Sequence, residues 1–185
     1  MSSRFGLQYA AQICRTGGII AYPTESVYGL GCDPLNETSV YRLLGLKQRR
    51  VEKGLILLTD DLQKLLPFID VSSQQQKQLL QQQEKPTTWL VAASELTPVW
   101  IRGAHAKVAV RITHHVVAAA LCALLPYPVV STSANPASKP PARNVLRIRQ
   151  YFPGQIDAIV SSATDLRGKP SVIRDLATGE IIRAG

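Results

Sequence analysis

Short apolar runs bounded by glycine or proline alternate along this chain with segments in which apolar residues recur every three or four positions. The runs are typical of buried strands, and the periodic segments are typical of helices that pack on a sheet. We expect strands at residues 19–22, 54–59, 88–92, 107–112, 128–130 and 156–160. We expect helices at residues 5–15, 37–47, 62–68, 72–84, 114–125 and 145–152. The segment 23–34, which is rich in proline, threonine, serine and glycine, is expected to be a structured loop.

The end of the chain has a different pattern. Residues 172–183 contain two short apolar segments around a glycine-containing turn at 177–179, which predicts a β-hairpin. Helices and strands alternate before this hairpin, and the sequence contains no internal repeat. We therefore predict an α/β fold with some α+β character: one open, twisted, mixed sheet flanked by helices, in a single domain over residues 1–185.

The composition narrows the class of protein. A chain of 185 residues with 45% apolar content is ordinary for one globular domain. No run of about 18 apolar residues occurs, so we expect no membrane span and no membrane partner. The first residues lack the apolar segment of a secretion signal, and we expect a cytoplasmic protein. Cys14, Cys32 and Cys122 are odd in number and widely spaced, which indicates neither a disulfide framework nor a metal site.

The charge of the chain points to anionic ligands. Lys and Arg total 21 against 13 Asp and Glu, a formal net charge of +8. A basic surface favours nucleotides, RNA or acidic lipid, although excess lysine and arginine can also serve only to keep a surface solvated. Neither G-x-x-x-x-G-K-[ST] nor G-x-G-x-x-G occurs in the sequence, so the usual nucleotide-binding fingerprints are absent.

Three polar blocks lie where an apolar run stops or a helix ends, the places where α/β folds position ligand-binding groups. They are AYPTESVYGLG at 21–31, KQRRVEKG at 47–54 and STSAN at 131–135. The second block contains three cations within seven residues, which suits a triphosphate, although basic helix ends also complement the helix dipole. The third supplies hydroxyls and amides for an anion, or forms a polar turn.

Other residues define what chemistry is available. Arg111 ends an apolar strand, where a guanidinium is costly unless an anion meets it. Glu25 could act as a base, but a lone glutamate in a loop is more often solvated or capping. His114 and His115 have no third metal ligand nearby, and we expect them at the start of a helix. No G-x-S-x-G motif and no Ser–His pairing is evident, so the sequence gives no support for covalent catalysis. The catalysis that remains is alignment of the reactants and neutralisation of their charge, as in phosphoryl or nucleotidyl transfer.

Taken in order, five motifs resemble the YrdC/TsaC family. They are YPTESVYGLG at 22–31, K-x-R-x-x-x-K-G-L at 47–55, VAVR at 108–111, STSAN at 131–135 and PSVIRD at 170–175. The resemblance implies an open twisted α/β sheet with a large basic concavity. It also implies a nucleotidyltransferase that makes L-threonylcarbamoyladenylate from L-threonine, bicarbonate and ATP with release of pyrophosphate. Partner proteins would then transfer the threonylcarbamoyl group to an adenosine beside the anticodon of tRNA.

The resemblance also implies roles for individual residues. Lys47 and Arg49 would act by position and charge, and no residue would act as a covalent nucleophile. Ser131 would lie between both substrates, and Arg111 would pair with the threonine carboxylate. Mg²⁺ would arrive bound to ATP, with no metal bound by the protein itself. The residues implied on the ATP side are Lys47, Arg49, Lys53, Ser133, Asn135 and Arg183. The residues implied on the threonine side are Thr24, Ser26, Thr88, Arg111, Ser131 and Ser171.

Two alternatives stay open at this point. The first is a non-catalytic tRNA- or RNA-binding module that uses the same basic concavity, which the basic helix with Arg147 and Arg149 favours. Weak tRNA binding could also accompany catalysis. The second is a degenerate paralogue that binds a nucleotide without turning it over.

Overall fold

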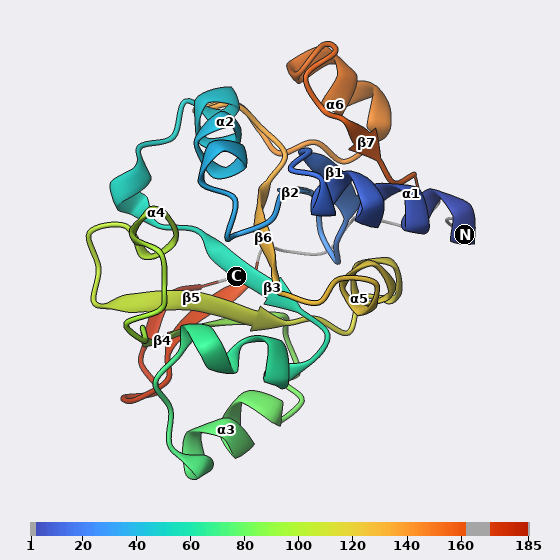
Figure 1. Cartoon of the computed structure of the whole chain (residues 1–185). Coiled ribbons are helices and arrows are strands. Elements are labelled where there is room, and N and C mark those ends of the chain that lie inside the picture. The colour runs from blue at the N-terminus through green and yellow to red at the C-terminus, as the bar shows by residue number, and fades with distance from the viewer. Residues whose placement is uncertain (1–2, 162–170, 185) are drawn as a thin grey trace.

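The computed structural model describes residues 3–161 and 171–184, and its strands form one mixed sheet (Figure 1). Across the sheet the order is β7-β1-β2-β6-β3-β5-β4-β8-β9. The strands are β1 Ile20–Pro23, β2 Tyr28–Gly31, β3 Ile56–Thr59, β4 Thr87–Ala92, β5 Lys107–Ile112, β6 Val129–Ser133, β7 Ala158–Ile159, β8 Val172–Asp175 and β9 Ile181–Arg183. The predicted fold class is confirmed. Pro170, the first residue of the fifth motif, lies outside the described residues.

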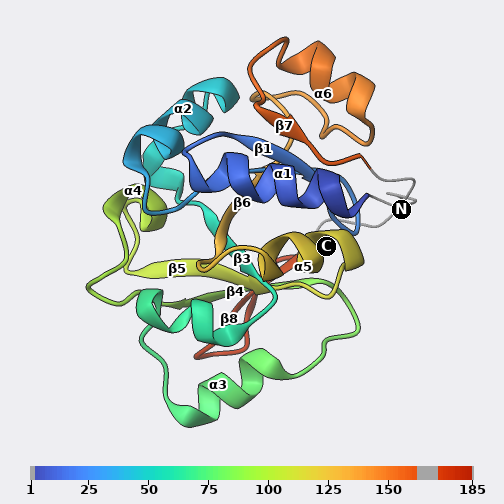
Figure 2. The same ribbon diagram turned by 45° about the vertical axis from the view of Figure 1, so that its right-hand side comes forward.

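Helices lie on both faces of this sheet (Figure 2), and several begin at a side chain that caps the helix. Asn36, His115 and Asn144 each accept a backbone N–H with the side chain at a helix start, which satisfies a donor that the helix leaves open. The α-helices are α1 Arg4–Arg15, α2 Glu37–Lys47, α3 Ser73–Leu80, α4 Val99–Arg102, α5 Val116–Ala123 and α6 Val145–Tyr151. The 3₁₀ turns are η1 Val51–Lys53, η2 Leu62–Lys64 and η3 Leu66–Phe68.

Some element predictions were wrong. The helix expected over residues 62–68 is two separate 3₁₀ turns, and the one expected at 72–84 ends at Leu80. Helix α4 was not predicted at all, because four residues are too few for a periodic pattern. The predicted C-terminal hairpin is confirmed as β8 and β9, with Gly179 at a positive φ of 74° in the turn.

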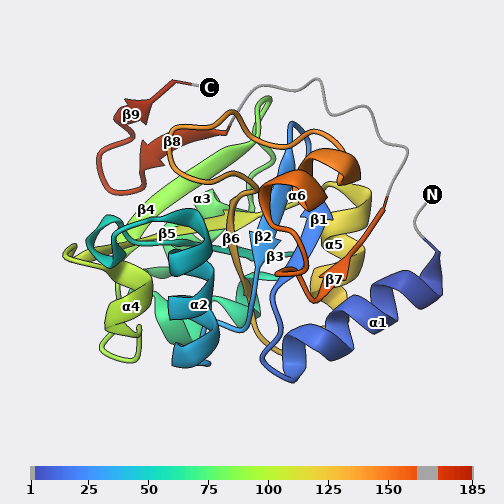
Figure 3. The ribbon, with the colours of Figure 1, turned by 90° about the horizontal axis from the view of Figure 1, so that it is seen from above.

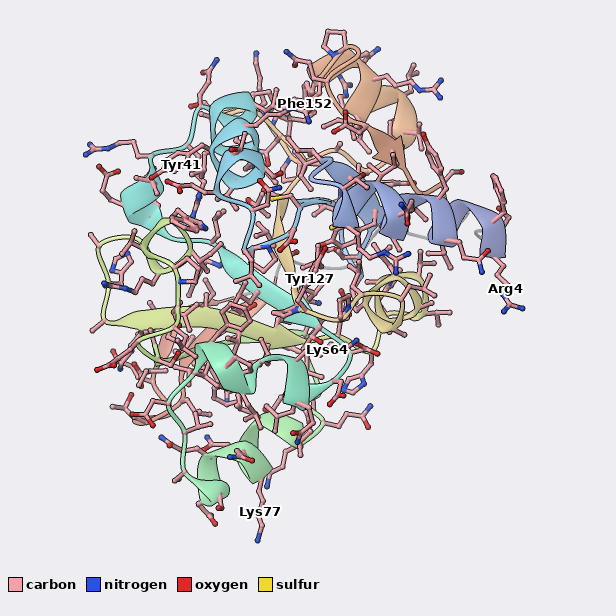
Figure 4. The ribbon with its side chains drawn as sticks, in the orientation of Figure 1. Arg4, Tyr41, Lys64, Lys77, Tyr127 and Phe152 are labelled. Atoms are coloured by element: carbon pink, nitrogen blue, oxygen red, sulfur yellow. The ribbon has the colours of Figure 1, made fainter. Side chains whose placement is uncertain are left out.

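The sheet is covered on both faces, as the alternation of side chains shows. Ile20 and Tyr22 of β1 point into a cluster formed with α1 and α5, whereas Ala21 points into a larger cluster that includes α2. Lys64 joins η2 to α5, since its Nζ donates to the carbonyl of Cys122 at 2.8 Å (Figure 4). Figure 4 also shows the solvent-exposed side chains of Arg4, Tyr41 and Lys77.

The segment 23–34 is not a loop throughout, because it contains the buried strand β2. Strands β1 and β2 form an antiparallel hairpin in which Ile20 pairs with Gly31 and Pro23 with Tyr28. A Cβ at Gly31 would lie 2.5 Å from the carbonyl oxygen of Val130, so only glycine allows β2 to approach β6 this closely. Glycines weaken the β-branched and aromatic signal of a strand, which explains why the sequence pattern indicated a loop.

Strand β6 belongs to two parts of the sheet. Its first residues pair with β3, where Ser131 lies opposite Ile56, and its last residues pair with β2, where Ser133 lies opposite Gly29. Figure 1 shows β6 running between these two parts. The predicted strand 128–130 therefore extends through the hydroxyl residues to Ser133. Figure 3 shows the β8–β9 hairpin at one edge of the sheet and β7 at the other.

The close approach at Gly31 can be tested by its effect on stability. Gly31→Ala should lower the free energy of unfolding by about 1–3 kcal/mol, because the neighbouring backbone of β6 must move. Gly45→Ala is the matched control: a Cβ there meets nothing within 4 Å in α2, so alanine should stabilise by about 0.5–1 kcal/mol. Urea unfolding of both variants checks this, and equal effects would contradict the close approach.

Candidate functional site

A cavity of about 770 Å³ lies on the sheet around β6, and nine of the twelve predicted site residues line it. The polar lining comes from β2 and the loop before it, from the segment after α2, from α4 and the turn after it, from β5, β6 and β9, and from Ser171 just before β8. The nine residues are Thr24, Ser26, Arg49, Lys53, Arg111, Ser131, Ser133, Ser171 and Arg183. Residues that are far apart in the sequence therefore meet at one place.

The alternation of side chains along β5 forms the floor of this cavity. Lys107, Ala109 and Arg111 face the cavity, while Val108 and Val110 are buried in the core on the other face.

The pairing of the strands shows in which order the lining residues follow one another along the cavity. In the strand pairing, Ala109 lies beside Ile56, which lies opposite Ser131. Arg111 lies two residues farther along β5, a separation of about 7 Å at the usual strand rise. The segment 49–54 precedes β3 and so lies toward the opposite end. Ser131 is therefore between the Arg111 end and the Arg49–Lys53 end.

The cavity is strongly positive. Its described lining contains six cationic side chains and no carboxylate. Sequence reasoning missed two of the six, Arg102 and Lys107. Arg102 belongs to the unpredicted helix α4, and Lys107 lies at the start of β5. A site with this charge favours a ligand with several negative charges.

Arg49 is held by the backbone around it. Gln48, the residue after helix α2, has a left-handed conformation that turns the chain, and the Nη2 of Arg49 donates to the carbonyl of Gly54 at 2.8 Å. Gly54 and Gly103 have φ of 62° and 66°, and this lets the segment lie directly against α4. In the described part of the chain the buried Nε of Arg49 has no hydrogen-bond partner, and burial lowers the pKa of the guanidinium. This buried donor suits an anionic ligand.

Lys47 does not line the cavity. Its Nζ donates to the backbone carbonyls of Ser133 and Asn135, the latter at 2.8 Å, and its own carbonyl accepts from the N–H of Ala137 at 2.9 Å. The residue is 5% exposed, and burial, with a smaller effect of Arg49, lowers its pKa to about 8. In this structure Lys47 ties the end of α2 to the end of β6.

Asn135 and Thr88 also lie behind the cavity surface. The amide of Asn135 donates to the carbonyl of Lys139 at 2.7 Å, and its oxygen accepts from the Ser133 hydroxyl at 2.6 Å. Thr88 is fully buried, with its hydroxyl 3.0 Å from that of Ser171. Both residues support neighbours that do line the cavity.

Arg111 has an acidic partner inside the protein. Glu25 forms an ion pair with it, and the other oxygen of Glu25 accepts from the Thr113 hydroxyl at 3.3 Å. From the sequence we expected Glu25 to be exposed to solvent or to cap a helix. Its position between Thr24 and Ser26, two predicted site residues, was a signal that it lies near the site. His115 caps α5 as expected, and burial, opposed by Glu25, lowers the pKa of its imidazole.

The C-terminal hairpin closes one side of the cavity. Arg183 donates to the carbonyl of Ser171 at 2.8 Å, and Asp175 forms an ion pair with Lys107 of β5. The hydrogen bond from Lys107 holds the pKa of the Asp175 carboxyl below its usual range. These contacts join both strands of the hairpin to the residues that line the cavity.

The structure also bears on metals, cysteines and membranes. Within residues 3–161 and 171–184, no group of three or more His, Cys, Asp or Glu side chains could hold a metal ion. The three cysteines are free and buried, and burial raises the pKa of each thiol. No helix in the described part of the chain is long and apolar enough to cross a bilayer.

Comparisons with known proteins agree with this architecture. A family model for Sua5, YciO and YrdC, described as "Telomere recombination", matches residues 12–185. The chain is 53% identical to a threonylcarbamoyl-AMP synthase of Cellvibrio japonicus over 96% of this chain and 94% of that protein. It is 50% identical to one of Pseudomonas savastanoi pv. phaseolicola over the full length of both.

Solved structures show the same fold. The structure of P. abyssi Sua5 complexed with L-threonine matches with a TM-score of 0.88 and 29% identity over 97% of this chain. This chain spans about half of Sua5, 53% of its length. The structure of E. coli YciO matches with a TM-score of 0.79 at 23% identity, covering 96% of this chain and 87% of that one, which shows the fold alone.

The buried ammonium of Lys47 predicts a pH dependence of stability. The unfolded chain keeps this proton up to its usual pKa of 10.5, whereas the folded protein releases it near 8. Between these values the unfolded state binds more protons, so this residue makes the protein more stable as the pH rises. From about pH 7 to about pH 10, wild type should gain about 2 kcal/mol relative to Lys47→Met. Urea unfolding at both pH values measures this gain, and parallel pH profiles would contradict it.

Proposed function

This chain belongs to the Sua5/YciO/YrdC family, and from that premise we propose that it is a threonylcarbamoyl-AMP synthase. It would form L-threonylcarbamoyladenylate from L-threonine, bicarbonate and ATP, with release of pyrophosphate. The observation that carries the proposal is the cavity that joins the cations of 49–53 to the hydroxyls of β6 and to Arg111. Such a cavity can hold a nucleotide and a carboxylate side by side.

The nucleotide end is the one that contains Arg49 and Lys53. Guanidinium and ammonium groups form strong, charge-assisted hydrogen bonds to phosphate oxygens. The Nε of Arg49, which is buried and has no hydrogen-bond partner among the described residues, is a donor available to such an oxygen. Ser133, next to these cations on the lining, would contact the nucleotide as well. Lys47 and Asn135 would contribute by shaping the end of β6.

The amino-acid end is the one that contains Arg111. Its guanidinium can bind a substrate carboxylate, and the hydroxyls of Ser26 and Ser171 lie on the same lining. Thr88 supports Ser171 from behind. The known complex of P. abyssi Sua5 with L-threonine supports an amino acid as the ligand of this fold.

In this mechanism the protein aligns the reactants and balances their charge. The threonine amine attacks the carbon that bicarbonate supplies and forms a carbamate; the oxygen lost from bicarbonate leaves as water, which takes up the proton lost by the amine. An oxygen of the carbamate then attacks the α-phosphorus of ATP, the bond to the β-phosphate breaks, and pyrophosphate leaves. Both reactants are anions, and the cationic lining offsets their repulsion while it holds them in line. This chemistry is nucleotidyl transfer.

Mg²⁺ would enter with ATP in this proposal. Because the described lining offers no carboxylate, the triphosphate itself would supply the oxygen ligands of the ion. We further infer that the adenylate passes to partner proteins that modify an adenosine beside the anticodon of tRNA, with the reaction in the cytoplasm. Any direct contact with tRNA would be weak and secondary.

The RNA-binding alternative is not favoured. Arg147 and Arg149, which motivated it, lie on α6, and α6 contributes no residue to the cavity lining. The guanidinium of Arg147 lies 5.6 Å from the centre of the Tyr151 ring in a cation–π contact, a local role that requires no RNA.

The proposed function is tested by comparing two adjacent arginines. Arg49→Ala should lower adenylate formation at least about tenfold, or about 1.4 kcal/mol at the transition state, because Arg49 lines the cavity. Arg50→Ala is the matched control: its side chain is 79% exposed and pairs with Glu52, so activity should change less than about twofold. The assay measures pyrophosphate release with ATP, threonine and bicarbonate, and detects the adenylate by mass. Equal activity of both variants would contradict the assigned site.

A further inference from the structure

The ion pair of Glu25 and Arg111 separates the main cavity from a second one. The second cavity has a volume of about 250 Å³ and lies beside Trp89, His115 and the segment 81–87. Arg111 lines both cavities, whereas Glu25 lines only the second. The carboxylate therefore meets the guanidinium from the side away from the main cavity.

In this ion pair each charge compensates for the burial of the other. Glu25 Oε2 and Arg111 Nη2 are both shielded from solvent, and apart from the ion pair that joins them neither has a hydrogen-bond partner within residues 3–161 and 171–184. Removing one charge would leave the other buried without compensation, which is strongly unfavourable. A guanidinium has five N–H donors in a fixed plane, so a carboxylate behind it leaves other donors for a carboxylate in front.

The carboxylate of Glu25 is itself held in place. Its Oε1 accepts from the hydroxyl of Thr113, which is 2% exposed, and this hydroxyl accepts from the backbone N–H of His115. His115 in turn caps α5 through its Nδ1. A continuous series of contacts thus runs from the start of α5 to the guanidinium of Arg111. This series fixes the position of the carboxylate that pairs with Arg111.

We propose that Glu25 is a positioning residue for the amino-acid substrate: it holds the Arg111 guanidinium from behind so that the front can bind the substrate carboxylate. The inference rests on the proposed function. The opposite role is a competitor, in which Glu25 occupies the place of the substrate carboxylate and must leave before threonine binds. The position of Glu25 on the second cavity and its bond to Thr113 argue for positioning.

The two roles predict opposite effects of Glu25→Gln. Positioning predicts that KM for threonine rises about tenfold or more, because the uncharged amide no longer holds the guanidinium. KM for ATP should change less than about twofold, and so should kcat at saturating threonine, because the ATP end of the cavity is untouched. Glu95→Gln, at an exposed position outside both cavities, is the matched control and should leave all three values unchanged. A fall in the threonine KM, or no change, would overturn the proposal.

Two further measurements separate this role from a general loss of structure. Thr113→Val keeps the charges but removes the bond to Glu25, and it should raise the threonine KM by less than Glu25→Gln does. In an Arg111→Ala background, Glu25→Gln should cause no further loss, since Glu25 acts through Arg111. Additive effects of the two substitutions would overturn the proposal.

An activity assay tests the synthase function, and a separate binding measurement tests the role of Glu25. Wild type is assayed first for the adenylate, and its absence would refute the synthase assignment itself. Calorimetric titration of L-threonine into wild type, Glu25→Gln and Glu95→Gln then measures amino-acid binding without turnover. Weaker binding to Glu25→Gln alone supports the positioning role, and equal or tighter binding overturns it.

Discussion

The pairing of β6 with two different strands is the constraint on which the site depends. Its first residues are in register with β3 and its last residues with β2, so Ser131 and Ser133 lie where the two parts of the sheet meet. That junction requires the backbone of β2 to lie very close to β6, which Gly31 permits. Because β3 also pairs with β5, the same register places Arg111 at one end of the cavity and the segment 49–54 at the other. The hydroxyls of β6 are thereby held between two cationic ends, which is the geometry needed to join two anions.

A cavity lined by six cations would be unstable without compensation, and the protein supplies it away from the open surface. Arg49, Arg102 and Arg183 donate to backbone carbonyls, while Lys107 and Arg111 pair with Asp175 and Glu25, two carboxylates that do not line the cavity. These partners reduce the mutual repulsion and fix the direction of five of the six side chains. The cationic groups are thus oriented before a ligand arrives, so less of the binding energy is lost in ordering them.

The sequence predicted what depends on local pattern and on motifs, and it missed what depends on tertiary contacts. The strand at 107–112 was predicted with its bounds because it is a short run of mainly apolar, β-branched residues. Strand β2 was missed because its two glycines weaken the strand signal, although one of them, Gly31, is required by the close approach of β6. The contacts of Lys47 could not be predicted either: its place among the cations suggested a phosphate ligand, but the bend of the chain after β6 brings two carbonyls to it. Glu25 was undervalued for the same reason, because its partner lies 86 positions farther along the chain (111 − 25).

Lys47 and Glu25 illustrate how buried charges can serve a site without lining it. Lys47 fixes the end of β6 at the Arg49 end of the cavity, and Glu25 fixes Arg111 at the other end. Burying either charge is costly unless it is paired or hydrogen-bonded, and each is compensated by contacts made only when distant segments are in place. If one such contact is lost, the charge stays buried without a partner, which is strongly unfavourable. The fold in which Lys47 and Glu25 both keep their partners is therefore favoured. The two ends of the cavity are therefore kept at a set separation by the same interactions that make the folded state specific.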